Sequence, residues 1–152
     1  MTEQLLETTI GFLYHEAAHV SSIFPDATNL TCTLTAGGVA NTYGNWAEIQ
    51  DSGATTFSSK FAAIEGHISA IIVEECSRND KVYMFELGLS HDGTNFTELS
   101  CFRFLSGTGN VPGVFQIRYR MPVIPAGVSL YYRMMCETAG ATAEVHFRYH
   151  TH

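Results

Sequence analysis

Charged residues are scarce in this chain of 152 residues. They make up 15% of the sequence, against roughly a quarter in an average soluble domain, and basic residues are the scarcest. Eight Lys and Arg stand against fifteen Asp and Glu, and Lys60 is the only basic residue before Arg78. Nucleic acids are bound by clusters of basic residues, so we expect no nucleic acid partner. Sparse charge also favours a surface that is partly covered by other subunits.

Other features that would point to a function are missing. No apolar run is long enough to span a membrane, and the start of the chain lacks the basic residues of a signal peptide, so we expect a protein made in the cytoplasm with no membrane partner. The four cysteines form no CxxC pair and fall within apparent strands, which predicts buried free thiols. No glycine-rich phosphate loop and no nucleophile elbow occurs. We therefore expect no cofactor.

What the sequence has is alternation of apolar and polar residues, rich in β-branched and aromatic side chains and interrupted by Gly, Pro, Asn and Asp. This pattern predicts about eight strands, at 29–35, 46–50, 67–75, 81–90, 96–105, 114–121, 128–136 and 142–150. Closely spaced turn signals favour an all-β fold, an antiparallel β-sandwich of the jelly-roll type, over 29–152.

Residues 1–28 follow a different pattern and form an N-terminal arm in this interpretation. Apolar residues recur there at a spacing of three and four, which would line one face of a helix: Leu6, Ile10, Leu13, Ala17, Val20 and Phe24. Against a helix, 8–14 holds strand-type residues and a glycine. Both structures remain open for this segment.

One motif resembles a catalytic site. His15, Glu16 and His19 match HExxH, in which two histidines one helical turn apart bind Zn²⁺ and the glutamate acts as general base on the bound water. The motif lacks a downstream extension with a third ligand, and the 14 residues before His15 are too few for a substrate-binding sheet. We therefore predict that the protein is not an enzyme and keep a zinc metallopeptidase only as the last alternative.

Two further groups are open to a binding role. His146, Arg148, His150 and His152 alternate along the last predicted strand, so they would share a face, either solvated, at an interface, or binding a metal. Trp46 could be buried or could stack on a sugar ring, so a carbohydrate-binding module is the first alternative function.

Three stretches carry a resemblance to a known family. They are 36–49 (AGGVANTYGNWAEI), 121–134 (MPVIPAGVSLYYRM) and 138–145 (TAGATAEV). Together they resemble segments of small virion structural proteins of tailed bacteriophages, and the match spans most of 36–146, leaving out the arm.

The resemblance implies a non-enzymatic structural component of a virion. Within it we favour a capsid decoration or head-associated protein over a tail component, with the major capsid or tail proteins as partners. A homo-oligomer, in particular a trimer, would multiply weak contacts on a particle. We expect three groups to make the contacts: the 106–113 loop, the arm through Leu6, Ile10 and Leu13, and the two arginines Arg118 and Arg120.

Overall fold

The computed structural model describes residues 21–107, 115–118 and 122–152, with the backbone alone for 115–118. The described part of the chain is all-β, as predicted, and its strands form two antiparallel sheets. In chain order the elements are β1 (Ser22–Phe24), β2 (Cys32–Thr35), β3 (Ala47–Glu48), the 3-10 helix η1 (Phe57–Phe61), β4 (Gly66–Cys76), β5 (Val82–Ser90), β6 (Thr97–Leu105), β7 (Phe115–Arg118), β8 (Ser129–Cys136) and β9 (Thr142–Thr151).

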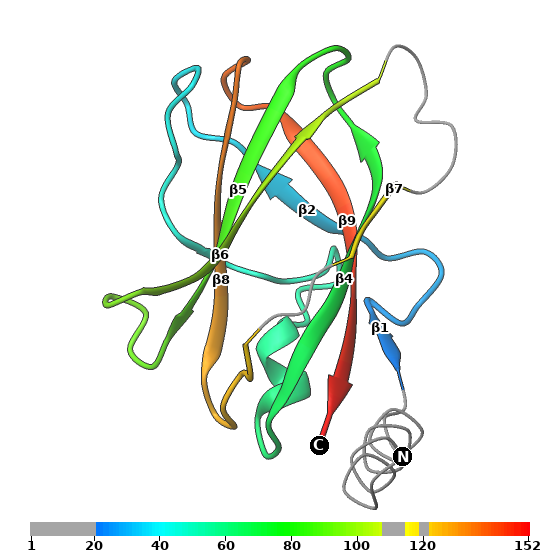
Figure 1. Ribbon diagram of the computed structural model, residues 1–152, viewed down its shortest axis with the longest axis vertical. Coiled ribbons are helices and arrows are strands. Elements are labelled where there is room, and N and C mark those ends of the chain that lie inside the picture. The colour runs from blue at the N-terminus through cyan, green and yellow to red at the C-terminus, as the bar shows by residue number, and fades with distance from the viewer. Residues whose placement is uncertain (1–20, 108–114, 119–121) are drawn as a thin grey trace, which may run out of the picture.

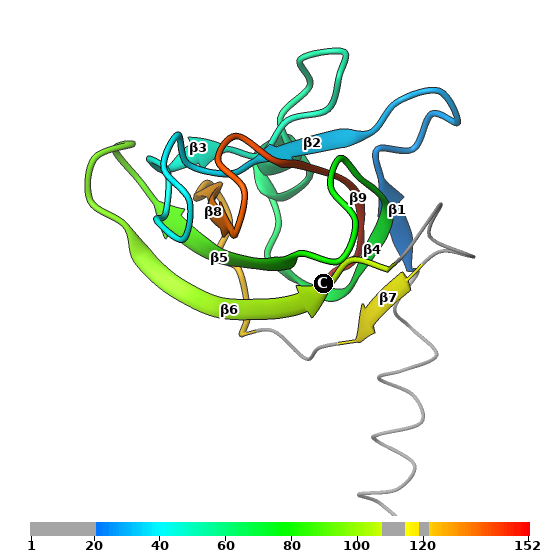
Figure 2. The ribbon, with the colours of Figure 1, turned by 90° about the horizontal axis from the view of Figure 1, so that it is seen from above.

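The strands divide between a five-stranded sheet and a four-stranded sheet. In the first, the order is β1-β9-β4-β7, and β2 pairs with β9 further along the same strand. In the second, the order is β3-β8-β5-β6. Figures 1 and 2 show the two sheets as separate layers. From β2 onward every connection passes from one sheet to the other, except the β5–β6 hairpin.

Alternation along each strand separates the core from the outer faces. In β8, Leu130, Tyr132, Met134 and Cys136 are buried, while the residues between them are half-exposed. β9 follows the same pattern, with Ala143, Val145, Phe147 and Tyr149 buried. Because successive side chains of a strand point to opposite faces, one apolar set fills the space between the sheets and the other set faces outward.

Aromatic side chains close one end of the core. Phe57, in η1, stacks on Phe24 and Phe147 with ring centroids 4.8 Å and 5.0 Å apart. It also meets Phe61 and Tyr149 edge-on. η1 therefore fixes the segment between β3 and β4 against the five-stranded sheet.

All eight predicted strands are present, within a few residues of their expected ends. The structure adds β1, which pairs with β9 through Ser22–Phe24. This strand lies inside the segment that the sequence assigned to the arm, so the sandwich includes residues before 29. A three-residue strand offers no alternation to detect. The helix-or-strand alternative for the earlier part of the arm lies outside the described residues.

Candidate interaction site on the four-stranded sheet

The three stretches that carry the family resemblance meet at one corner of the sandwich. The loop after β2 folds back onto the end of β8, where the amides of Gly37 and Gly44 both donate to the Met134 carbonyl, at 3.0 Å and 3.1 Å. The Gly140 amide donates to the Gly37 carbonyl at 3.0 Å and joins the β8–β9 turn to the loop. A Cβ on Gly37 would lie 2.5 Å from the Thr42 carbonyl oxygen. Only glycine fits there, so this corner is closely specified by its sequence.

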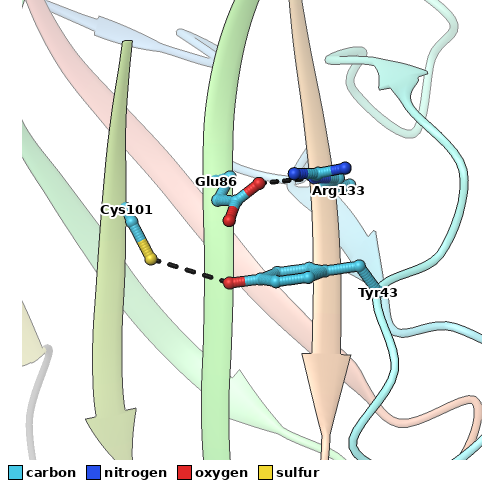
Figure 3. A network of polar contacts seen from close by, with 4 residues as sticks. All are labelled: Tyr43, Glu86, Cys101 and Arg133. Atoms are coloured by element: carbon cyan, nitrogen blue, oxygen red, sulfur yellow. Dashed lines mark hydrogen bonds and ion pairs between the residues drawn. The ribbon is translucent and has the colours of Figure 1, made fainter. Parts of the chain in front are cut away.

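This loop brings two aromatic rings onto the outer face of the four-stranded sheet. The Arg133 guanidinium carbon, on β8, lies 4.9 Å from the centroid of the Tyr43 ring and 4.8 Å from that of Trp46. Its Nε donates to Oε2 of Glu86 on β5 (Figure 3). Glu86 is buried and pairs directly with Arg133 across the sheet. A positive charge held by a carboxylate and two ring faces is strongly fixed in position.

Trp46 is also packed on other groups. Its ring stacks on Phe96 with centroids 5.2 Å apart, and Phe96 meets Tyr131 edge-on at 5.0 Å. The edge of the indole lies over Gly88, where a Cβ would be 2.9 Å from two of its ring carbons. We call Tyr43, Trp46, Glu86, Phe96 and Arg133 the aromatic clamp.

Cys101 lies at the end of the clamp, on β6, which is an edge strand of the four-stranded sheet. The Tyr43 hydroxyl is 3.6 Å from its Sγ, and Figure 3 shows the ring reaching across β8 and β5 toward it. Burial raises the pKa of Tyr43, and the hydrogen bond to Cys101 and the nearby Glu86 carboxylate raise it further. Tyr43 is therefore a neutral phenol in the physiological range.

This arrangement is suited to contact with another molecule. The guanidinium and the carboxylate neutralise each other, and the rings are half-exposed. Beyond the clamp the outer face continues with Met84, Met135 and two exposed β6 residues, Arg103 and Leu105. Leu105 is 64% exposed. A rigid, nearly neutral surface with apolar side chains is the kind that proteins use for association.

The structure does not describe most of the residues that the sequence singled out. Outside the described residues lie the HExxH residues His15, Glu16 and His19, the arm residues Leu6, Ile10 and Leu13, and Arg120. The contacts expected of the arm and of Arg120 stay predictions, and the zinc metallopeptidase stays an untested alternative. Arg118 is the last residue of β7, where its backbone pairs with Ala70. Of the described part of the chain, no three His, Cys, Asp or Glu side chains are arranged to hold a metal ion.

Two other expectations can be compared with the structure. His146, Arg148 and His150 do share the outer face of the five-stranded sheet. Trp46 is half-exposed and in contact with both Arg133 and Phe96, so a sugar stacking on its ring would compete with these contacts.

Sequence reasoning missed the clamp as a unit. Tyr43, Trp46 and Arg133 belong to the stretches that carry the resemblance, but nothing in their spacing indicates that they meet. Glu86 stands inside an otherwise apolar strand, and a carboxylate in such a place calls for a partner. The position of Glu86 was therefore the one feature of the sequence that could have indicated the clamp.

Comparison with family models, with curated proteins and with solved structures gave no match. In the described ranges, no helix is long and apolar enough to cross a membrane.

Proposed function

We propose that this protein is a non-enzymatic structural component of a tailed-phage virion, a capsid decoration or head-associated subunit that forms a homo-oligomer on the particle. We further propose that its sandwich is a jelly roll. The strand order carries the proposal of a jelly roll, and the resemblance of three stretches to phage virion proteins carries the proposal of the virion role.

The eight strands from β2 through β9 pair according to a single rule. β2 pairs with β9, β3 with β8, β4 with β7, and β5 with β6, so that the first strand pairs with the last and the pairs nest inward. A jelly roll has this nesting, because a long hairpin is wrapped into two Greek keys. The eight strands divide four to each sheet in this arrangement, and β1 extends the first sheet.

Jelly rolls occur in viral capsid proteins, in lectins and in cupins, so the strand order alone does not select among them. The resemblance of three stretches to phage virion proteins favours the first. Those stretches form one hydrogen-bonded corner and supply three of the five clamp residues. The sparse charge of the chain agrees with a subunit that is partly covered by its neighbours.

The proposal is tested first by light scattering on the purified full chain after size exclusion. We expect a stable mass of three 16.7 kDa chains or more. A monomer at about 100 µM would contradict the homo-oligomer, because the contacts between copies would then have a dissociation constant above about 100 µM.

A matched pair of variants tests the predicted contact of the arm. Leu13→Asp is expected to reduce the mass toward that of the monomer. Ile64→Asp changes an apolar side chain that is 42% exposed between η1 and β4, away from the clamp, and it is expected to leave the mass unchanged. An unchanged mass for Leu13→Asp would overturn the assignment of the contact to the arm.

The location is tested separately, with an antibody raised against the purified protein. We expect its signal to sediment with phage particles from the lysate of the source culture. A signal that stays in the soluble fraction, while particles sediment, would overturn the virion proposal.

A further inference from the structure

Three histidines gather on the outer face of the five-stranded sheet, away from the aromatic clamp. His67 on β4 lies directly opposite His150 on β9 in the antiparallel register. His152 follows two residues later, and its amide donates to the Glu65 carbonyl at 2.9 Å, which continues the pairing past the end of β9. Residues two apart on a strand point to the same face, so all three imidazoles lie on one side of the sheet.

The rings are in direct contact. His67 Nδ1 and His152 Nε2 are 2.9 Å apart, and the two ring centroids are 5.0 Å apart. His150 stacks on His67 at a centroid distance of 5.0 Å and an interplanar angle of 26°. His150 therefore packs against the face of the His67 ring.

We propose that His67 and His152 form a binding site for a divalent first-row transition metal that favours imidazole, of the Ni²⁺ or Cu²⁺ type. The ion binds His67 Nδ1 and His152 Nε2, which face each other across the shared hydrogen bond. Binding requires both rings to be neutral, with the remaining protons on His67 Nε2 and His152 Nδ1. Water completes the coordination.

The distance between the two nitrogens favours this class of metal. Imidazole nitrogens bind such ions at about 2.0–2.1 Å, so two ligands in cis positions of a square-planar or octahedral set are about 2.9 Å apart. The corresponding distance for a tetrahedral zinc site is about 3.4 Å. The observed 2.9 Å fits the first geometry, so only the ring orientations need to adjust.

Other histidines of the described ranges have different surroundings and serve as controls. His146 lies on the same face of β9, but its Nδ1 is 3.2 Å from Oε1 of Glu74. His91 lies in the exposed turn between β5 and β6. Among the described residues, no ring contact joins His146 or His91 to a second imidazole.

A bound ion would join β4 to the residue after β9. It would bind the folded chain and not the unfolded chain, in which the two ligands are 85 residues apart. Metal should therefore raise the unfolding temperature.

The test is calorimetric titration of the purified full chain with NiCl₂, with MgCl₂ as the control ion. We expect one Ni²⁺ per chain in the wild type and in His146→Gln and His91→Gln. Affinity should fall about 10-fold or more in His67→Gln and in His152→Gln, and both should lose the rise in unfolding temperature. His152→Gln lies past the last strand and keeps the test valid even where His67→Gln folds poorly.

Unchanged Ni²⁺ affinity in His67→Gln and His152→Gln would overturn the proposal. So would an equal loss in His146→Gln, which would indicate a diffuse surface effect. His15→Gln identifies the remaining competitor, because loss of binding there, with binding kept in His152→Gln, would assign the ion to the HExxH motif and overturn the site proposed here.

Discussion

The two sheets of this sandwich differ in what covers their outer faces. On the four-stranded sheet, the loop after β2 folds over the strands and lays both Tyr43 and Trp46 against Arg133. On the five-stranded sheet, the polar groups contact near neighbours on adjacent strands. Glu144 of β9 accepts hydrogen bonds from Thr31 and Thr33, and His146 approaches Glu74 across the sheet.

The difference concerns burial more than charge. Both faces carry a carboxylate with partners, but Glu86 is buried under aromatic rings, whereas the Thr33–Glu144 hydrogen bonds are solvent-exposed. Removing one partner of a buried charge pair lowers the free energy of unfolding much more than removing one partner of a solvent-exposed pair. We therefore expect the two faces to respond differently to matched substitutions.

The largest effect is expected for Arg133→Ala. The substitution leaves the buried Glu86 carboxylate without its partner and removes two cation–π contacts. Arg133 itself is about one-third exposed, which reduces the cost of breaking the pair, so we expect a loss of about 3 kcal/mol in the free energy of unfolding. Denaturant unfolding measures it.

Glu144→Ala is the matched control on the other sheet, with an expected loss of about 1 kcal/mol. Equal losses for Arg133→Ala and Glu144→Ala would mean that the clamp adds nothing to the stability of its face. A larger loss for Glu144→Ala would reverse the comparison.

A smaller effect is expected for Gly88→Ala. The new methyl would lie 2.9 Å from the indole carbons of Trp46, so the ring has to move, at a cost of about 1–3 kcal/mol. Trp46 is the single tryptophan, so intrinsic fluorescence reports this site alone, and we expect a shift of the emission maximum to longer wavelength.

Gly38→Ala is the control for this variant, because nothing lies within 4 Å of the added carbon. It should change neither the fluorescence nor the stability by more than a few tenths of a kcal/mol. An emission spectrum of Gly88→Ala identical to that of the wild type would show that the ring does not rest on Gly88.

The smallest effect, with no change in stability, is expected from thiol labelling. Cys101 is exposed on the outer face of the four-stranded sheet, whereas Cys32 faces the core. Burial raises the pKa of Cys32 to about 12, with smaller contributions from Asp51 and Glu144. Burial also raises the pKa of Cys76 to about 11. Since the thiolate is the reactive form, these two thiols should react slowly at pH 8.

A colorimetric disulfide reagent should therefore modify one thiol per folded chain at pH 8, and Cys101→Ser should abolish this reaction. The raised pKa values also predict a pH dependence of stability. The neutral thiols favour the folded state up to about pH 9, and this contribution is lost as the pH rises through 11 and 12. Rapid modification of two thiols in the folded protein would contradict the burial of Cys32 and Cys136 or the partial burial of Cys76.

Much of the fold could be read from residue patterns, but the site could not. Tyr83, Phe85, Leu87 and Leu89 alternate along β5, as an amphipathic strand requires; the first three are buried in the core, and Leu89 is partly buried and packs against it. η1 was missed because Phe57–Phe61 has no strand period and is too short to show a helical one. The pairing of Arg133 with Glu86 joins residues 47 apart in the sequence, and the spacing of residues says nothing about such pairs.

The sequence by itself determined that the chain forms strands, where they lie and which side of each is apolar, because alternation and turn residues act over a few neighbouring positions. Tertiary structure decided which strands are partners and in which register. That choice brings Arg133 beside Glu86 and His67 beside His152. Its physical reason is that the register depends on hydrogen bonds and packing between distant segments, and a shift of one residue would turn every outward side chain toward the core.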